Sequence, residues 1–304
     1  MSRSLLLLSY GAPEKPEDVV PYLHNLFGGK PVSEQRLNAA VKKYERYAAT
    51  AGHYSPLNNE CRKLAAGVRE ELRRLNSAVP IYEACLFCSP QLNETFEKMH
   101  KDGIDRTDVF ITSAFTGLRY DELIAAVQNS VRLHRLPLPA LPSNPAHKLF
   151  LKAQTDTLLT ALANNTLESS GSRIVLFSAH SLPKNVPSTG NYVQLLTQVC
   201  RSIAGLCQEP FDWELVFQSA SGSAENWLAP DIKDRLRQLA DERKYASVVV
   251  SPLGFFCENM ETEYDLDIEA GQLCRELGLD FYRAGTVGNS PDIYRMLASM
   301  ITGK

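Results

Sequence analysis

The sequence predicts an α/β fold in which parallel strands alternate with helices. Short runs rich in leucine, valine and isoleucine are followed by longer amphipathic stretches along the chain, which is the pattern of strand–helix units. The 304 residues suffice for two domains of about 150 residues each. Residues 136–146 contain four prolines, which neither a helix nor a central strand tolerates, and a similar rhythm precedes and follows them. We therefore expect two similar halves.

Each expected strand is a short apolar run. The strands are expected at residues 5–8, 81–85, 109–112, 174–177, 215–217, 247–250 and 281–283. Each expected helix is an amphipathic stretch. The helices are expected at residues 16–27, 33–49, 59–75, 92–101, 121–133, 192–206, 231–243, 259–277 and 291–301. Two of these starts carry a good capping residue, Ser33 before Glu34 and Asp231 after Pro230.

The composition is typical of an ordinary folded protein. Hydrophobic residues make up 44% of the chain and charged residues 22%, which excludes a disordered chain and a collagen-like repeat. The net charge of −3 and the scattered basic residues argue against binding of nucleic acid. No stretch reaches the roughly 20 apolar residues of a membrane span, and the run at residues 5–8 is shorter than the ~7–15 residues of a signal-peptide core. We expect a cytoplasmic protein, and peripheral contact with a membrane stays open.

The seven cysteines are expected to be free thiols, because their number is odd and no export signal is predicted. Cys85 and Cys88 form the one Cys-x-x-Cys motif, with no second pair at zinc-ribbon spacing. We interpret them as buried thiols at a strand end, with redox or metal binding as the alternative. No cysteine follows Cys274, so we expect no iron–sulfur cluster.

Dinucleotide-binding, phosphate-loop and serine-hydrolase motifs are also missing, so no organic cofactor is expected.

Residues that follow the expected strands are the first candidates for a site, because ligands of open parallel sheets bind beyond the carboxyl ends of the strands. His180 is the strongest single candidate, since it follows the strand at residues 174–177 and precedes the turn Ser181-Leu182-Pro183. A structural histidine in the core is the alternative. The position of His180 favours a functional role, whereas the other five histidines lie on helices or irregular segments.

A group of acidic residues follows the expected strand at residues 247–250. Its members are Glu258, Glu261, Glu263, Asp265, Asp267 and Glu269. In an α-helix Glu261, Asp265 and Glu269 share one face, with Glu258 on the same stripe. A separate apolar stripe is formed by Met260, Tyr264 and Ile268. A solvated acidic face is the alternative, but the place of the group at a strand end favours carboxylates that face a cleft. Together with His180, these carboxylates would suit the transient binding of Fe²⁺, Mg²⁺ or Mn²⁺, or the transfer of protons.

Longer motifs spread over nearly the whole chain resemble those of ferrochelatase, the enzyme that inserts ferrous iron into a porphyrin at the end of haem synthesis. The most specific are Phe177-Ser178-Ala179-His180-Ser181-Leu182-Pro183 and Glu261-Thr262-Glu263-Tyr264-Asp265-Leu266-Asp267-Ile268-Glu269. The others are Leu7-Leu8-Ser9-Tyr10-Gly11-Ala12-Pro13, Tyr54-Ser55-Pro56-Leu57, Met99-His100-Lys101-Asp102-Gly103, Gln218-Ser219 and Trp227-Leu228-Ala229-Pro230-Asp231.

The resemblance implies two similar Rossmann-like domains of the chelatase type. Each would be a four-stranded parallel sheet flanked by helices, with the porphyrin in the cleft between the domains. On this basis we expect an N-terminal domain at residues 1–140, joined by a C-terminal helix at about 288–304. A C-terminal domain at residues 141–287 would carry the catalytic histidine and the acidic helix.

The resemblance also implies roles for single residues. His180 and Glu261 would be the catalytic pair at the porphyrin centre, and Asp265 and Glu269 would continue the acidic path, so that all four would contact the metal. The residues that match porphyrin contacts are Tyr10, Ser55 and Trp227. A neutral imidazole can accept the pyrrole protons, and carboxylates hold Fe²⁺ loosely enough to release it as a substrate.

Two departures from the family leave open the effect of Asn259 and the choice between protoporphyrin IX and coproporphyrin III. Glu258-Asn259 stands where the family usually has Asp-His, and Cys85-Leu86-Phe87-Cys88 stands where many members carry basic residues. One alternative function is a cobalt or iron chelatase for sirohydrochlorin, although those enzymes typically have a histidine in place of Tyr10. The other is a non-catalytic tetrapyrrole-binding or haem-carrier protein.

The expected partners are a porphyrin and ferrous iron. Transient contact with neighbouring enzymes of the haem pathway or with a membrane surface is a further expectation, and nucleic acid is not expected. The chain is expected to be a monomer or a homodimer.

Overall fold

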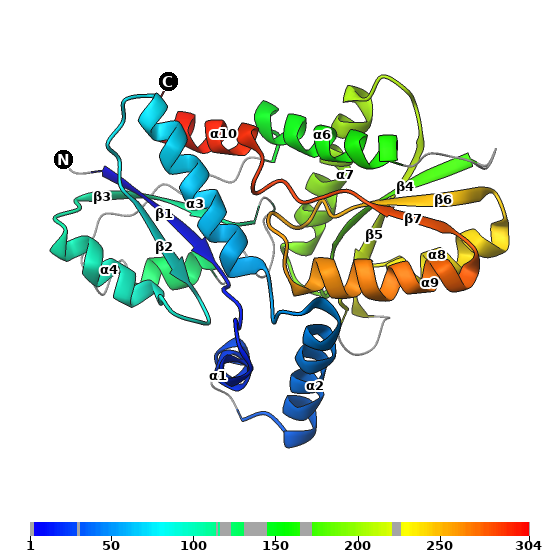
Figure 1. Ribbon diagram of the computed structural model, residues 1–304, viewed down its shortest axis with the longest axis horizontal. Helices are drawn as coiled ribbons and strands as arrows, with labels where there is room; N and C mark the ends of the chain where they lie inside the picture. Colours follow the sequence, from blue (N-terminus) through cyan, green and yellow to red (C-terminus); the bar gives the residue numbers. More distant parts are fainter. Residues whose placement is uncertain are drawn as a thin grey trace. The chain divides into compact units, whose positions relative to one another are not determined.

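The computed structural model describes residues 3–28, 31–113, 115, 123–130, 145–164, 172–220 and 226–303. Figure 1 shows its helices and strands. The chain divides into two compact units. The first comprises Met1–Thr112, Asp121–Pro142 and Leu297–Lys304, and the second comprises Ser113–Tyr120 and Ser143–Met296. Each unit has a parallel sheet of its own.

The sheet of the first unit has the strand order β2-β1-β3. Its strands are β1 (Arg3–Ser9), β2 (Ile81–Cys85) and β3 (Arg106–Ile111). Leu5 to Leu8 on the central strand β1 are all nearly inaccessible to solvent, as expected of a parallel strand that is covered on both faces. The helices of this unit are α1 (Pro16–Leu26), α2 (Glu34–Ala51), α3 (Leu57–Arg74) and α4 (Leu92–Lys101), with a further helical stretch at 123–130. Helix α3 packs on β1 and β2.

The sheet of the second unit has the strand order β5-β4-β6-β7. Its strands are β4 (Ser172–His180), β5 (Asp212–Gln218), β6 (Tyr245–Ser251) and β7 (Asp280–Arg283). Its α-helices are α6 (Lys148–Asn164), α7 (Thr189–Leu206), α8 (Ile232–Glu242) and α9 (Gly271–Leu277). A π-helix, η2 (Glu261–Ala270), continues directly into α9. The last helix, α10 (Pro291–Thr302), contributes residues to both units.

The core of the second unit is built on both faces of its sheet. Helices α8, η2 and α9 bury Leu236, Leu266 and Cys274 against Leu176 and Val250 of the central strands. Helix α6 packs against α7 and against β6 and β7, and Figure 1 shows it on the side of the sheet opposite α9. The strand ends are therefore the part of this sheet that the helices leave uncovered, which is where a site is expected.

The expected α/β class and all seven expected strands are confirmed, with bounds that shift by a few residues. Both expected caps are also confirmed, because Ser33 Oγ accepts the N–H of Arg36 and Asp231 Oδ1 accepts the N–H of Lys233. The expectation of four strands in each sheet holds for the second unit, whereas the described part of the first sheet has three strands. The proline-rich residues 136–146 lie largely outside the described residues.

Helix α6 was not predicted, because its apolar residues surround the helix instead of forming one stripe. Leu159, for example, is 43% exposed although Leu158 next to it is fully buried. The stretch at residues 259–277 was predicted as one α-helix, yet its first ten residues from Glu261 form the π-helix. Among the helices that the structure describes, none is both long and apolar enough to cross a lipid bilayer.

Candidate active site

The candidate site of the second unit lies at the point where the order of its strands reverses. From β4 the chain passes to β5 on one side and then to β6 on the other, so the carboxyl ends of β4 and β6 flank a crevice of the kind that binds ligands in such sheets. His180 is the last residue of β4, and Glu261 is the first residue of η2, which follows β6. The topology thus brings together two residues that are 81 positions apart in the sequence.

His180 and Glu261 face each other across 3.6 Å, measured from Nε2 to Oε1. The other ring nitrogen, Nδ1, lies 2.5 Å from the carbonyl oxygen of Ser181. Because a carbonyl oxygen can only accept, Nδ1 carries the hydrogen and the neutral ring has its lone pair on Nε2. Both side chains remain partly open to solvent, at 28% for His180 and 36% for Glu261. The pair therefore presents a basic nitrogen beside a carboxylate that can stabilise its protonated form.

The backbone of His180 is fixed from two sides. The hydroxyl of Tyr192 on α7 donates to the carbonyl oxygen of His180 at 3.1 Å. The loop after β6 lies directly against β4, because Gly254 N–H donates to Ser178 O at 3.0 Å and a Cβ at position 254 would lie 2.7 Å from Cα of Ala179. Only glycine permits this approach. It allows the chain to start η2 beside His180.

Tyr192 is a functional neighbour that the sequence analysis missed. Its ring is buried, and burial together with the charge of Glu261 raises its pKa, so the hydroxyl stays protonated and remains a donor. The sequence carries no signal for this role, since Tyr192 looks like any aromatic residue on the apolar face of a helix.

Glu261 is also held from two sides. The side-chain amide of the buried Gln218, at the end of β5, donates to the carbonyl oxygen of Glu261 at 3.1 Å. Oδ1 of Asn259 accepts the backbone N–H groups of Glu261 at 2.7 Å and of Thr262 at 3.1 Å. Asn259 thus caps the first turn of η2 through its side-chain amide oxygen. Its role at this site is to orient the first turn of the helix that carries Glu261.

Asn259→Ala is expected to lower the free energy of unfolding by about 1 kcal/mol, because two backbone N–H groups lose their acceptor. We also expect a slower reaction, since the turn that carries Glu261 loosens. Urea unfolding and the turnover rate would measure the two effects. Asn259→Ser keeps an oxygen acceptor and serves as the control. Equal stability of the alanine and serine variants would contradict the capping role.

The acidic residues do not form the single stripe that an α-helix predicts. Asp265 is buried and accepts a short hydrogen bond from the hydroxyl of Ser219, which follows β5. Glu269 accepts from Lys233 of α8 at 3.0 Å. In the described part of the chain no group of three or more His, Cys, Asp or Glu side chains is arranged to hold a metal ion. Glu261, Asp265 and Glu269 each face a different partner.

Two expectations about this segment are wrong. Glu258 precedes the helix and does not belong to its stripe, because its carboxylate faces Arg283 at 3.0 Å. The expected apolar stripe is not the buried face either. The wider turn of the π-helix instead buries Thr262, Asp265, Leu266 and Ala270. The neutralising charges come from other elements, since Lys233 lies on α8 and Arg283 on β7.

Comparison with known proteins identifies the family of this chain. The family model described as Ferrochelatase matches residues 2–304, which is nearly the whole chain. The chain belongs to the ferrochelatase family. It is therefore a chelatase, an enzyme of porphyrin metal insertion with ferrous iron as its metal substrate.

Curated relatives support the same assignment. Ferrochelatase of Rhodopirellula baltica is 34% identical over 304 residues, which cover 98% of this chain and 85% of the relative. Coproporphyrin III ferrochelatase of Frankia alni is 35% identical over 320 residues, covering 98% and 79%. Among solved structures, the sirohydrochlorin chelatase SirB from Bacillus subtilis in complex with cobalt has a TM-score of 0.54 at 13% identity, covering 99% of this chain and 94% of that one. At this identity the likeness shows the chelatase fold alone.

The expected porphyrin contacts of this ferrochelatase fall on both units. Trp227 belongs to the second unit, where its backbone pairs with Pro183 in the loop after His180. Tyr10 follows β1 in the first unit, and its ring stacks on Phe87 with 6.0 Å between the ring centroids. Ser55 precedes α3, where its hydroxyl accepts the N–H of Leu57. Trp227 therefore pairs with the loop that follows His180, whereas Tyr10 and Ser55 are placed only within the first unit.

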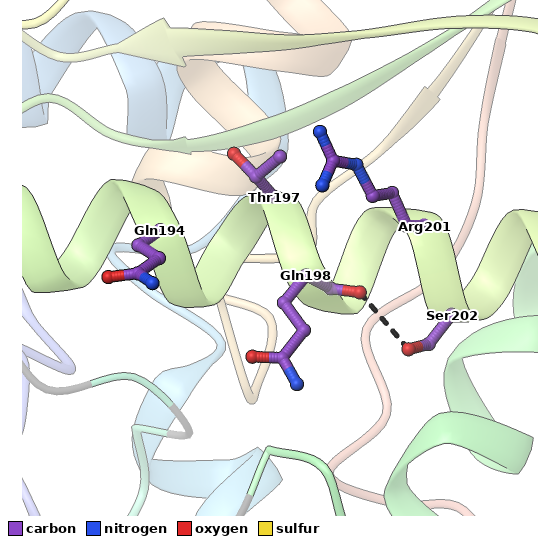
Figure 2. A pocket seen from close by; sticks show the side chains of 5 residues that line it. All are labelled: Gln194, Thr197, Gln198, Arg201 and Ser202. Atoms are coloured by element: carbon purple, nitrogen blue, oxygen red, sulfur yellow. Dashed lines mark hydrogen bonds between the residues drawn. The ribbon is translucent and has the colours of Figure 1, made fainter.

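A surface hollow in the second unit has no part in this site. Figure 2 shows that all of its lining side chains project from the single helix α7, where Ser202 bonds to the backbone of Gln198. None of them is a predicted site residue, and they include no carboxylate, imidazole or thiol. The hollow offers no chemistry for metal insertion.

Proposed function

We propose that this chelatase inserts Fe²⁺ into coproporphyrin III, with His180 as the base and Glu261 as its charge partner. The observation that carries the proposal is the 3.6 Å pairing of Nε2 of His180 with Oε1 of Glu261, both partly open to solvent at the reversal point of the sheet. Insertion releases two pyrrole protons, so the site needs a group that accepts a proton near neutral pH.

The geometry of His180 suits that task. Because Nδ1–H is bound to Ser181 O, Nε2 is the ring atom that receives a pyrrole proton. The imidazolium that forms lies within ion-pair distance of Glu261, whose negative charge stabilises it. Proton release then regenerates the neutral ring for the second transfer.

The same residues support a role for carboxylates in handling the metal. Glu261 lies beside His180 and is partly open to solvent, so we assign to it the contact with incoming Fe²⁺ together with His180. Asp265 and Glu269 would lie farther along the path that ions or protons follow. Oxygen donors suit Fe²⁺ in transit, because thiolates would hold it more tightly.

The proposed porphyrin contacts rest on residue type and place. Trp227 and Tyr10 offer flat apolar rings to a flat macrocycle. Ser55 offers a hydroxyl near a helix start, which suits a propionate group. The loop pairing of Trp227 with Pro183 supports its role most directly, because the same loop begins at His180.

Coproporphyrin III is proposed as the substrate because several relatives with similar identity carry that name, from Frankia alni, Nocardia farcinica and Streptomyces coelicolor. We expect kcat/KM with Fe²⁺ to be at least about tenfold higher for coproporphyrin III than for protoporphyrin IX, equivalent to about 1.4 kcal/mol of transition-state stabilisation. The measurement is metalloporphyrin absorbance under anaerobic conditions.

The other outcomes of this comparison overturn the proposal in different ways. A preference for protoporphyrin IX would reverse the substrate assignment and leave the chemistry intact. Insertion into sirohydrochlorin alone would place the enzyme with the sirohydrochlorin chelatases. Binding of both porphyrins without insertion would indicate a carrier protein.

A further inference from the structure

Cys85 and Cys88 lie close together at the carboxyl end of β2, and neither has a role in the proposed insertion of the metal. Their positions are constrained by Gly11, which has a φ of +71° in the loop after β1. A Cβ atom at Gly11 would lie no more than 3.1 Å from either Sγ atom, so both sulfurs converge on one small volume. Glycine leaves that volume free.

The two thiols have different surroundings. Sγ of Cys88 accepts hydrogen bonds from the thiol of Cys85, the N–H of Ala12 and the side-chain amide of Asn58, the last at 3.9 Å. These donors outweigh burial and the nearby Glu14 and lower the pKa of Cys88 to about 7. Cys85 has the opposite shift, because its hydrogen bond to Cys88 and its burial raise its pKa.

The pair is partly accessible. Both residues are only half-buried, and Cys85 lines a cavity of about 280 Å³ together with Cys61 and Asn58. Among the other five cysteines only Cys207 is half-buried, and the rest are buried. Zinc in a structural site takes four ligands, and no third donor completes a metal cluster here in the described residues. The pair is thus arranged for thiol chemistry.

We propose that Cys85 and Cys88 form a redox-active dithiol whose co-substrate is a low-molecular-weight disulfide. The thiolate of Cys88 attacks one sulfur of that disulfide, its S–S bond breaks, and the leaving thiolate takes up a proton from solvent. Cys85 then loses its proton and attacks Sγ of Cys88, which expels the second small thiolate. The two cysteine thiols are oxidised to one disulfide, and the small disulfide is reduced to two thiols.

Oxidation of the two cysteines would affect the loop that carries Tyr10. Between the two cysteines, Leu86 N–H donates to Ser9 O and Phe87 N–H donates to Tyr10 O, both at 3.0 Å. The ring of Phe87 also stacks on that of Tyr10. A disulfide between Cys85 and Cys88 would therefore alter the hydrogen bonds and the ring contact that hold Tyr10. An effect on porphyrin binding is the one consequence that rests on the proposed function.

Alkylation of the full-length chain tests the first step without any porphyrin. Cys207 is a matched control in the same protein, because burial raises its pKa. At pH 7 we expect iodoacetamide to modify Cys88 at least about fivefold faster than Cys207, with a rate that rises around pH 7. Modification of Cys88 no faster than that of Cys207 would overturn the assignment of Cys88 as the attacking thiolate.

Oxidation by 2-hydroxyethyl disulfide tests the second step. Trypsin cleavage after Arg74 and Lys98 yields a peptide, residues 75–98, whose only cysteines are Cys85 and Cys88. We expect this peptide to lose two hydrogens on oxidation and to regain them with excess 2-mercaptoethanol. In Cys85→Ser the mixed disulfide should accumulate on Cys88, and in Cys88→Ser residue 85 should stay unmodified. A wild-type peptide that carries only mixed disulfides, or remains reduced, would overturn the proposal.

Discussion

Replacement of His180 by alanine is expected to lower kcat for iron insertion by about 10²–10⁴-fold while porphyrin still binds. The variant loses the basic ring nitrogen that faces Glu261. It keeps the backbone position, because the bond from Tyr192 reaches the carbonyl oxygen of residue 180 and not its ring. The expected loss is therefore in the chemical step.

Single-turnover insertion measures that step, and quenching of the fluorescence of Trp213 and Trp227 measures porphyrin binding. His100→Ala is a matched control, since His100 is exposed at the end of α4 and should leave both quantities unchanged. Glu261→Gln keeps the shape of the carboxylate but not its charge, so we expect a smaller loss than in His180→Ala. Iron insertion by His180→Ala at the wild-type rate would exclude His180 as the base.

The sequence predicted the part of the site that follows from local pattern and topology. A run of apolar residues marks β4 as a central strand, and ligands of parallel sheets bind at the carboxyl ends of such strands, so His180 could be singled out before the fold was known. The acidic group that contains Glu261 could be found in the same way, because it follows β6, whereas the choice of Glu261 within it came from the resemblance to ferrochelatase. That the two meet required only that both strands end at the same edge of one sheet.

The partners of the remaining carboxylates could not be predicted in this way. Lys233 lies 36 residues from Glu269, and Arg283 lies 25 residues from Glu258. No spacing rule connects such pairs, because their contact depends on how α8 and β7 pack around η2. The acidic segment therefore looked unneutralised in the sequence, although packing neutralises both of its ends.

The π-helix was also beyond sequence reasoning. Residues 259–277 satisfy the pattern of an α-helix, and nothing in residue type marks a wider turn. The consequence reaches the site, because the wider turn buries Asp265 and directs it to Ser219. A segment with an irregular helix at a functional position is a recurrent place for such predictions to fail.

Arg283→Met is expected to lower the free energy of unfolding of the second unit by about 3–5 kcal/mol. Arg283 is only 15% exposed and Glu258 19% exposed, and the guanidinium also binds both oxygens of Asp267, at 2.6 and 2.9 Å. Methionine keeps much of the apolar stem but leaves the carboxylate of Glu258 buried without its cation. Urea unfolding would measure the loss, which corresponds to roughly 6–20 °C in Tm.

Arg237→Met is the matched control, because Arg237 and Asp234 form an exposed ion pair on α8, with side chains 55% and 65% exposed. We expect it to change the free energy of unfolding by no more than about 0.5 kcal/mol. A loss of similar size in both variants would show that the buried network around Arg283 contributes nothing beyond a surface pair.

The pH dependence separates the loss of charge pairing from a loss of packing. Burial opposes ionisation of Glu258, but the charge of Arg283 and the bonds from Thr286 N–H and Thr262 outweigh it and lower the pKa of Glu258 below its ordinary value. This stabilisation of the wild type is present above pH 4.5 and is lost as the pH falls through the lowered pKa. In Arg283→Met the positive charge that offsets the burial of Glu258 is lost, so the pKa of Glu258 should rise. The variant should then have a lower free energy of unfolding than the wild type at neutral pH but not in acid. The difference in unfolding free energy between wild type and variant should therefore narrow from pH 7 toward pH 3, whereas a packing defect would keep it constant.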